Sequence, residues 1–393
     1  MEKDVFVVAA QRTAIGDFGG GLKSLSPIDL AVPLMKATLE RSGLPMDKVG
    51  KVILGNTLAP LNPNIARGSA ITCGIPPEIP SFTIHCACAS AMQAFISGIS
   101  AIMLGETETA LVGGVESMSN APYVLASARW GQRLRHAQAT DLLWWGMQED
   151  PIMGGQGRSA DYLAKKYNIS REEQDELAVL SHERALKAQY EGYFENEIVP
   201  TEVRERKKTN LVVQDEHPRE DATLENLAKL PAVFSEEGTV TAGNASAIND
   251  GAAAIVLATK EACKEYGMKP LVKTGAWSIK AADPKLTGVA PVPAIRDVLA
   301  SSGLSVSDLN LIEINEAFAA YYLACEKELG LKRDRVNVKG SGISLGHPVG
   351  ATGCRIVVTL IHEMMRQDVG LGLASLCAGG GMGYAILIGR DSL

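Results

Sequence analysis

An internal repeat constrains the fold of this chain more than any other feature of its sequence. Residues 33–44 and 293–304 both follow the pattern P-x5-L-x2-S-G-L, at a constant offset of 260 residues. Each segment has the pattern of a helix that ends near a glycine. Each is followed by an apolar run that ends in asparagine, at Asn56 and Asn315. One such match could arise by chance, but the matching continuation favours a duplication.

Short apolar runs bounded by glycine or polar residues alternate with these helical patterns, as buried strands do in α/β proteins. We therefore predict a duplicated α/β fold made of two similar halves. The predicted strands are KVILG, TALVGGV, LIEI and LASLCAGG, at 51–55, 109–115, 311–314 and 373–380.

The composition changes between about 120 and 241, where the chain becomes more polar. The features that mark the change are Arg129, Arg133, Arg135, Trp144, Trp145 and a mixed-charge segment that starts with a possible capping box from Ser170 to Glu173. We predict an exposed helix there, within a domain inserted at 120–241. The two halves would then be 1–119 with 242–269, and 270–393. Such an insertion either covers a binding cleft or only elaborates the surface.

The overall composition excludes several classes of protein. A formal net charge of −7 argues against a nucleic-acid partner, which would require a basic face. The first apolar run is too short for a signal peptide, and no later run reaches the length of a membrane span. Seven scattered cysteines do not suit a secreted disulfide framework. We expect a cytoplasmic protein without a membrane partner.

Cys88 is the first candidate for chemistry, because an extended apolar stretch turns into a helix of small residues at this point. A thiol at a helix N-terminus meets unpaired N–H groups and the positive end of the dipole, which can lower its pKa toward neutrality. For a lone cysteine, simple burial is the commoner role. A metal site formed with His85 and Cys86 is disfavoured, because no second ligand pair at zinc spacing follows.

His347 lies in a glycine-dense loop before a long predicted helix, and Pro348 follows it. A tight turn of this kind can aim an imidazole ring, although a surface turn would explain the histidine equally well. Phosphate cradling by the glycines is a further alternative, but the loop lacks the G-K-[ST] ending of a P-loop.

Two more segments carry candidate residues. Cys377 stands between an apolar strand and the glycines of a predicted hairpin, whose backbone N–H groups could face a ligand oxygen. Asn315 stands between a predicted strand and a helix, where asparagine is also an ordinary helix cap.

Five motifs taken together resemble the thiolase family. In chain order they are C-A-S-A-M-Q-A, V-T-A-G-N-A-S, N-E-A-F-A, G-I-S-L-G-H-P-V-G-A-T-G and C-A-G-G-G-M-G, and the likeness covers almost the whole chain. The resemblance implies two α/β halves of layered helices and sheets, an inserted loop domain, and acyl transfer on coenzyme A thioesters, as in fatty acid metabolism. It also implies a homodimer or homotetramer.

The resemblance also implies roles for individual residues. Cys88 would be the nucleophile, His347 its base and Cys377 the second acid and base. Asn315 would hold a water that stabilises the thioester enolate together with His347. The N–H groups of Cys88 and Gly379 would form the other oxyanion site.

The substrate contacts carried over from the family are Ser246 for pantetheine and Arg219 for the adenine side. The implied partners are acyl-CoA and 3-ketoacyl-CoA thioesters and coenzyme A, which enters as a substrate. No metal and no redox cofactor are implied.

The chain departs from the family pattern around the expected acyl pocket. His85 replaces an asparagine, and Ala91 and Ala247 replace glycines. The segment at 155–161 lacks the histidine and methionine of the usual H-M-G-x-T-A-E, and Thr287 replaces another methionine. We hypothesise that the acyl group is not plain acetoacetyl, and we expect His85 to pack rather than to tune the thiol.

Two rival functions remain open at this level. A one-way condensing enzyme of the same superfamily would generally have histidine or asparagine in place of the C-A-G-G-G segment. A non-catalytic acyl-CoA or lipid carrier would bind these thioesters without turnover.

Overall fold

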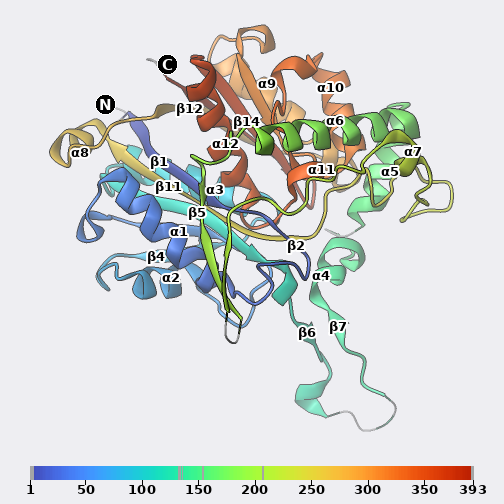
Figure 1. Cartoon of the computed structure of the whole chain (residues 1–393), viewed down its shortest axis with the longest axis horizontal. Coiled ribbons are helices and arrows are strands. Elements are labelled where there is room, and N and C mark those ends of the chain that lie inside the picture. The colour runs from blue at the N-terminus through green and yellow to red at the C-terminus, as the bar shows by residue number, and fades with distance from the viewer. Residues whose placement is uncertain (1–3, 132–133, 135, 153–154, 206–207, 391–393) are drawn as a thin grey trace.

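An eleven-stranded mixed sheet organises the protein, in a computed structural model that describes residues 4–131, 134, 136–152, 155–205 and 208–390 (Figure 1). The central order is β13-β14-β15-β12-β1-β11-β5-β3-β4, with β2 added beside β11 and β8 beside β1. The strands are β1 (Val5–Thr13), β2 (Gly16–Asp17), β3 (Val52–Gly55), β4 (Ser81–Ile84), β5 (Thr109–Ser117), β8 (Ile198–Val199), β11 (Asn249–Thr259), β12 (Val272–Ala281), β13 (Leu311–Ile314), β14 (Leu371–Ala378) and β15 (Met382–Gly389).

The duplication predicted from the repeat is visible in the strand order. From β1 outward the N-terminal half runs β1, β11, β5, β3, and from β12 outward the C-terminal half runs β12, β15, β14, β13. The pair β3 with β5 and its counterpart β13 with β14 are parallel, whereas the inner pairs are antiparallel. The N-terminal half has one further parallel strand, β4, outside β3. The repeated segments form α1 (Pro27–Ser42) and α9 (Pro291–Ser301). All four predicted strands are confirmed as β3, β5, β13 and β14.

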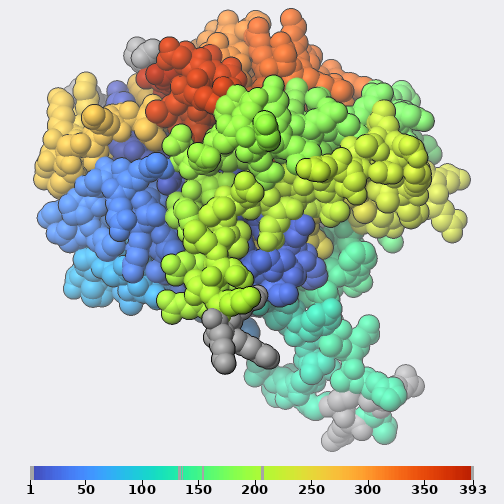
Figure 2. All heavy atoms as spheres, in the orientation of Figure 1, coloured from blue at the N-terminus to red at the C-terminus, as the bar shows by residue number. Residues whose placement is uncertain are grey.

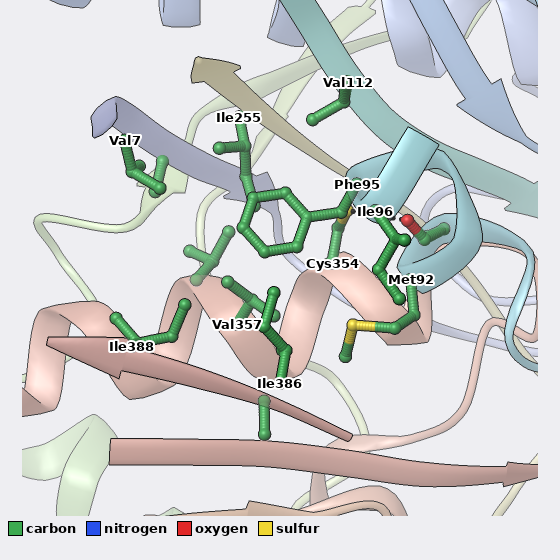
Figure 3. Packing of buried hydrophobic residues seen from close by; sticks show 14 of the residues in the cluster. Val7, Met92, Phe95, Ile96, Val112, Ile255, Cys354, Val357, Ile386 and Ile388 are labelled. Atoms are coloured by element: carbon green, nitrogen blue, oxygen red, sulfur yellow. Dashed lines mark hydrogen bonds between the residues drawn. The ribbon is translucent and has the colours of Figure 1, made fainter. Parts of the chain in front are cut away.

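Two helices fill the centre of the molecule between the halves. They are α3 (Ser90–Met103), which precedes β5, and α12 (Thr352–Gln367), which precedes β14. Phe95 of α3 and Val357 of α12 lie in one buried cluster with Ile255 and Ile386 of the two half-sheets (Figure 3). Because apolar side chains surround both helices, each is buried along nearly its whole length.

The strands are buried on both faces, as the continuous apolar runs predict. On β11, Ile255 and Leu257 face the central helices, whereas Ala254 and Val256 face the outer cluster around α1 and α2 (Ile65–Cys73). In the other half, the outer layer consists of α9 and α10 (Ala319–Leu329). The layered α/β fold expected from the sequence is thereby confirmed.

The region from 120 to 241 adds the remaining irregular and helical elements. Besides β8 of the large sheet, its helices and strands are β6 (Tyr123–Val124), β7 (Thr140–Asp141), α4 (Leu142–Trp144), α5 (Gln156–Lys166), α6 (Arg171–Tyr190), β9 (Thr201–Glu205), β10 (Lys208–Val212) and α7 (Leu224–Ala228). Figure 2 shows that its first part projects from the body as an arm. Arg129 and Trp130 are exposed on this arm, while Arg133 and Arg135 lie outside the described residues. Short helices α8 (Lys260–Glu265) and α11 (Gly342–Leu345) belong to the main body.

Helix α6 begins at the predicted capping box, because the Ser170 side chain accepts from Glu173 N and the Glu173 side chain accepts from Ser170 N. The expectation of an exposed helix is correct for only part of its surface. One face, including Leu177, Ser181 and His182, is buried. Ser181 Oγ donates to Glu316 Oε2 at 2.6 Å. Because several of the buried side chains are polar, the sequence of this helix shows no hydrophobic periodicity that would predict a buried face. None of the described helices is both long and apolar enough to cross a bilayer.

Candidate active site

The loop before α3 holds Cys88 in a tight, strained turn. Ala87 has a left-handed φ of 46°, which costs energy for a residue with a Cβ. The turn is closed by Ser90, whose hydroxyl accepts from Cys86 N at 2.9 Å and donates to Ala87 O at 2.6 Å. The helix start predicted at this position is confirmed.

The Cys88 thiol is surrounded by backbone donors and is partly buried. Backbone N–H groups of Gly379 and Cys88 itself hydrogen-bond to the sulfur and lower its pKa, while burial raises it and Glu116 adds to the rise. Burial is the largest contribution, and it raises the pKa of Cys88 to about 11. The expectation that the helix start brings this pKa toward neutrality is therefore wrong, because desolvation of the thiolate outweighs the N–H groups.

His347 is held by both its backbone and its ring. Its N–H donates to Asn249 Oδ1 at 2.9 Å, and its Nδ1 lies 2.7 Å from Thr352 Oγ1. Since the Thr352 hydroxyl donates its hydrogen to Pro348 O at 2.9 Å, its oxygen accepts a hydrogen bond from the Nδ1–H group of the ring. This leaves Nε2 as the basic nitrogen, and Nε2 is buried without a hydrogen-bond partner among the described residues. Burial, aided by Arg355, lowers the pKa of His347 to about 3.

Cys377 lies at the end of β14, just before the predicted hairpin turn. The hairpin is confirmed, since Ala378 pairs with Met382 across Gly379, Gly380 and Gly381. Gly380 and Gly381 have φ of 87° and 83°, a backbone region that favours glycine. Burial raises the pKa of the Cys377 thiol well above its usual value, and the nearby Cys88 adds to the rise.

Asn315 follows β13 and lies beside the imidazole. Its side-chain nitrogen is 3.5 Å from His347 Nδ1, and its Oδ1 is buried without a partner among the described residues. The Asn315 Oδ1 atom could therefore accept a hydrogen bond from a small polar ligand such as a water.

One cavity of about 510 Å³ connects most of the predicted site residues. Cys88, His347, Cys377 and Gly379 all line it, whereas Asn315 lies behind its wall. Ser246 and Arg219, the two predicted coenzyme A contacts, also line the cavity. The inserted region contributes Trp144, Met147, Gln148, Gln156, His217, Arg219, Val233 and Phe234 to the same walls, so it borders the cleft and does more than elaborate the surface.

Comparison with known proteins identifies the family to which this site belongs. Residues 5–261 match the family described as thiolase, N-terminal domain, and residues 268–390 match thiolase, C-terminal domain. The chain belongs to the thiolase family. The resemblance recognised from five motifs is thereby confirmed, and the chain is an acyltransferase with coenzyme A-dependent thiolase activity.

Individual thiolases match over their whole length. The acetyl-CoA acetyltransferase of Chromobacterium violaceum is 44% identical over 98% of this chain and 100% of its own. The crystal structure of the Bacillus anthracis acetyl-CoA acetyltransferase is 46% identical, with a TM-score of 0.97 and 99% coverage of both chains. Human mitochondrial 3-ketoacyl-CoA thiolase, solved in complex with CoA, is 40% identical, with a TM-score of 0.94 and coverage of 99% of this chain and 98% of that one.

The departures from the thiolase pattern fall in different surroundings. The side chain of His85 is exposed and lines a second cavity beside Cys88, so the expected packing role is wrong. Gln156, in the altered segment at 155–161, lines both cavities. Thr287 is buried, donates to Pro284 O at 2.7 Å and lines neither cavity. Ala247 also lines the larger cavity, whereas Ala91 lines neither. His85, Gln156 and Ala247 can therefore contact a bound substrate directly.

Sequence reasoning missed three residues of this thiolase site. Glu116 at the end of β5 accepts a hydrogen bond from Gly350 N at 3.0 Å, close to His347. Thr352 fixes the imidazole, and the A-T-G segment that contains it gives no sign of this role. Tyr321, buried near both thiols, donates to Gln156 O at 3.0 Å. These roles depend on contacts between distant segments, so only the position of Tyr321 soon after N-E-A-F-A could have drawn attention to it.

Proposed function

We propose that this thiolase cleaves 3-ketoacyl-CoA, or forms it in reverse, through an acyl group carried on Cys88. The observation that supports the proposal best is the meeting of Cys88, His347 and Cys377 at one cavity, with two N–H groups on the Cys88 sulfur. A nucleophile, a base and a second proton donor are the groups that a two-step acyl transfer requires.

In the first step of cleavage, the Cys88 sulfur attacks the keto carbon of the substrate while His347 Nε2 takes the thiol proton. The bond between C2 and C3 then breaks, and its electron pair forms the enolate of acetyl-CoA. Cys377 gives its proton to C2 of this enolate and becomes a thiolate. Acetyl-CoA leaves, and the shortened acyl group stays on Cys88.

In the second step, the Cys377 thiolate takes the proton of an incoming coenzyme A thiol. The coenzyme A sulfur attacks the acyl carbon, and Cys88 leaves and recovers its proton from His347. Condensation follows the same path in reverse, with Cys377 removing a proton from the methyl group of acetyl-CoA. The reaction is complete with these side chains and the substrates, so no resident cofactor enters it.

The pKa values indicate when the thiolate forms. With the pKa of Cys88 near 11 and that of His347 near 3, both groups are neutral in the free enzyme at pH 7. Proton transfer is then favourable only as negative charge moves onto the substrate oxygen, where fixed donors stabilise it. The N–H groups of Cys88 and Gly379 supply this stabilisation for the negatively charged tetrahedral intermediate that forms on Cys88.

The enolate requires a separate oxyanion site on the side of the base. His347 Nε2, which none of the described residues hydrogen-bonds, and the neighbouring Asn315 amide are suited to this role, with a water held by Asn315. A developing enolate oxygen there would meet polar groups in a largely apolar site, where each hydrogen bond is strengthened.

Coenzyme A would enter past Ser246, with Arg219 near its adenine end. Both residues line the larger cavity on the side of the inserted region, and a related thiolase has been solved with CoA. The cytoplasmic location and the homodimeric or homotetrameric assembly expected from the sequence stay predictions.

The test is a thiolysis assay with acetoacetyl-CoA and free coenzyme A. The wild type should form acetyl-CoA, and mass spectrometry should detect an acyl group on the peptide that contains Cys88. Cys88→Ala should lose about 10⁴-fold or more in kcat and form no acyl-enzyme, since a covalent step has no substitute.

Cys86→Ala is the matched control, because Cys86 lies two residues away and hydrogen-bonds to Tyr384. It should keep most of the activity. Full activity in Cys88→Ala, or thioester binding by the wild type without any turnover, would refute the proposal.

A further inference from the structure

Two cavities meet at the Cys88 thiol. The larger one leads toward Ser246 and Arg219, and a second one, of about 340 Å³, contains neither of these residues. The walls that both cavities share are Cys88, Met118, Met147, Gln156, Val349 and Gly379. A substrate bound to Cys88 therefore has one space for its coenzyme A portion and a separate space on the side of His85.

The walls specific to the second cavity are mostly apolar. Leu58, Leu143 and Trp145 lie there, together with Thr57, Ala87 and Gly146. His85 and Asp150 are its titratable residues besides Cys88 among those described. Apolar walls favour apolar groups, since each buried methylene contributes favourably and an unpaired charge is penalised.

The size of the second cavity exceeds what an acetyl group needs. At about 30 Å³ for a group the size of a water molecule, 340 Å³ has room for roughly ten such groups, whereas an acetyl group has only three heavy atoms. An acetyl group on Cys88 would leave most of the apolar wall without a partner.

We propose that the second cavity holds the acyl portion of the substrate, and that the preferred portion is apolar and about six to ten carbon atoms long. This inference rests on the proposed function and assigns its substrate class. The loop after β3 and the segment around α4 form the pocket, so these two segments determine chain-length preference. The altered position at Gln156 lies where the two cavities join.

The first experiment compares the wild type on a series of thioesters that differ in acyl length. The ester 3-ketodecanoyl-CoA should give a kcat/KM at least tenfold above the value for acetoacetyl-CoA, because even one methylene in a fitted pocket can change kcat/KM by that much. An ester of similar length that ends in a carboxylate should be poorer than the apolar one. Equal or better turnover of acetoacetyl-CoA, or of the carboxylate ester, would overturn the inference while leaving the proposed function intact. No turnover of any ester would instead refute the proposed function.

The second experiment fills the cavity. A Cβ added at Gly146 meets nothing within 4 Å, and Gly146 has no left-handed φ, so Gly146→Phe adds bulk without backbone strain. Leu58→Trp adds bulk from the loop after β3. Each variant should lower the preference for 3-ketodecanoyl-CoA over acetoacetyl-CoA, measured as the ratio of the two kcat/KM values, by about tenfold.

The matched control is Gly370→Phe, where an added Cβ also meets nothing within 4 Å but the site is exposed and far along the chain between α12 and β14. This variant should keep the wild-type ratio. An unchanged ratio in both Gly146→Phe and Leu58→Trp would show that the acyl portion binds elsewhere.

Discussion

The two halves of this thiolase place different chemistry at equivalent positions. In the parallel pair β3 and β5, Gly55 lies opposite Gly114, and in β13 and β14, Ile314 lies opposite Ser375. Two residues beyond each point, the N-terminal half has Glu116 and the C-terminal half has Cys377. Equivalent strand ends therefore carry a carboxylate in one half and a thiol in the other.

Glu116 is fully occupied by hydrogen bonds. It accepts from Asn56 Nδ2 at 2.9 Å, from the N–H groups of Thr57 and Leu58 at 3.0 and 3.1 Å, from the Thr57 hydroxyl, and from Gly350 N. Gly350 must be glycine, because a Cβ there would lie 2.5 Å from Glu116 Oε2. The carboxylate thus connects the loop after β3 to the loop of His347, whereas Cys377 is left to react.

The starts of the two central helices differ in the same way. The loop before α3 gives the thiol of Cys88, and the loop before α12 gives the imidazole of His347. Because α3 and α12 pack together at the centre, the duplication brings a nucleophile and a base from opposite halves to one cavity. A duplicated scaffold supplies the geometry, and divergence at matching positions supplies the separate roles.

The largest effect should come from removing the thiol of the C-terminal half. Cys377→Ala should lower kcat for both thiolysis and condensation by roughly 10³-fold, the scale of lost general acid–base catalysis. Acylation of Cys88 by acetyl-CoA, followed by mass spectrometry of the peptide, should persist, because His347 can pass the proton of Cys88 to the departing coenzyme A sulfur when the Cys377 thiol is absent. Cys263→Ala, a buried cysteine in the other half, is the control. Loss of acylation in Cys377→Ala would show that Cys377 is also required to form the acyl-enzyme, and the separation of roles between the two thiols would be wrong.

An intermediate effect should appear in the reactivity of the Cys88 thiol. Since burial raises its pKa to about 11, the thiolate fraction should grow about tenfold per pH unit below that value. Alkylation of the Cys88 peptide by iodoacetamide should therefore accelerate about a hundredfold from pH 7 to pH 9. An alkylation rate that no longer rises above pH 7 would mean that the helix start and His347 already ionise the thiol. Burial would then not be the dominant influence on the pKa of Cys88.

The smallest effect should come from Glu116→Gln, which keeps the shape but directs an amide N–H₂ at groups that donate. We expect the free energy of unfolding to fall by about 1–3 kcal/mol, measured by chemical denaturation. The exposed Glu236→Gln should change it little.

The difference in stability between the wild type and Glu116→Gln should depend on pH. Burial raises the pKa of Glu116 to about 7, above the ordinary 4.5, so the folded state retains a proton that the unfolded state has lost between these values. The free energy of unfolding of the wild type should therefore decline relative to Glu116→Gln as pH rises from about 5 to about 7. If the free energy of unfolding of the wild type instead rose relative to that of Glu116→Gln over this pH range, the five hydrogen-bond donors, and not burial, would determine the pKa of Glu116.

Much of the fold could be read from the chain because its signals are local. The repeat predicted the two halves, apolar runs predicted the strands, and glycines after Cys377 predicted the hairpin turn. The family motifs placed Cys88, His347, Cys377 and Asn315 because each motif combines a reactive residue with the small residues that its turn requires.

The sequence by itself determined the duplicated α/β fold, the thiolase family and the candidate reactive residues. Only the tertiary structure decided the state of these groups. The partial burial of Cys88 depends on helices and strands that are hundreds of residues apart. The same holds for His347 Nε2, which has no hydrogen-bond partner in the part of the chain that the structure describes. The contacts of Glu116 and the second cavity likewise arise where segments from both halves and the inserted region meet, and no local pattern records a surface formed by distant segments.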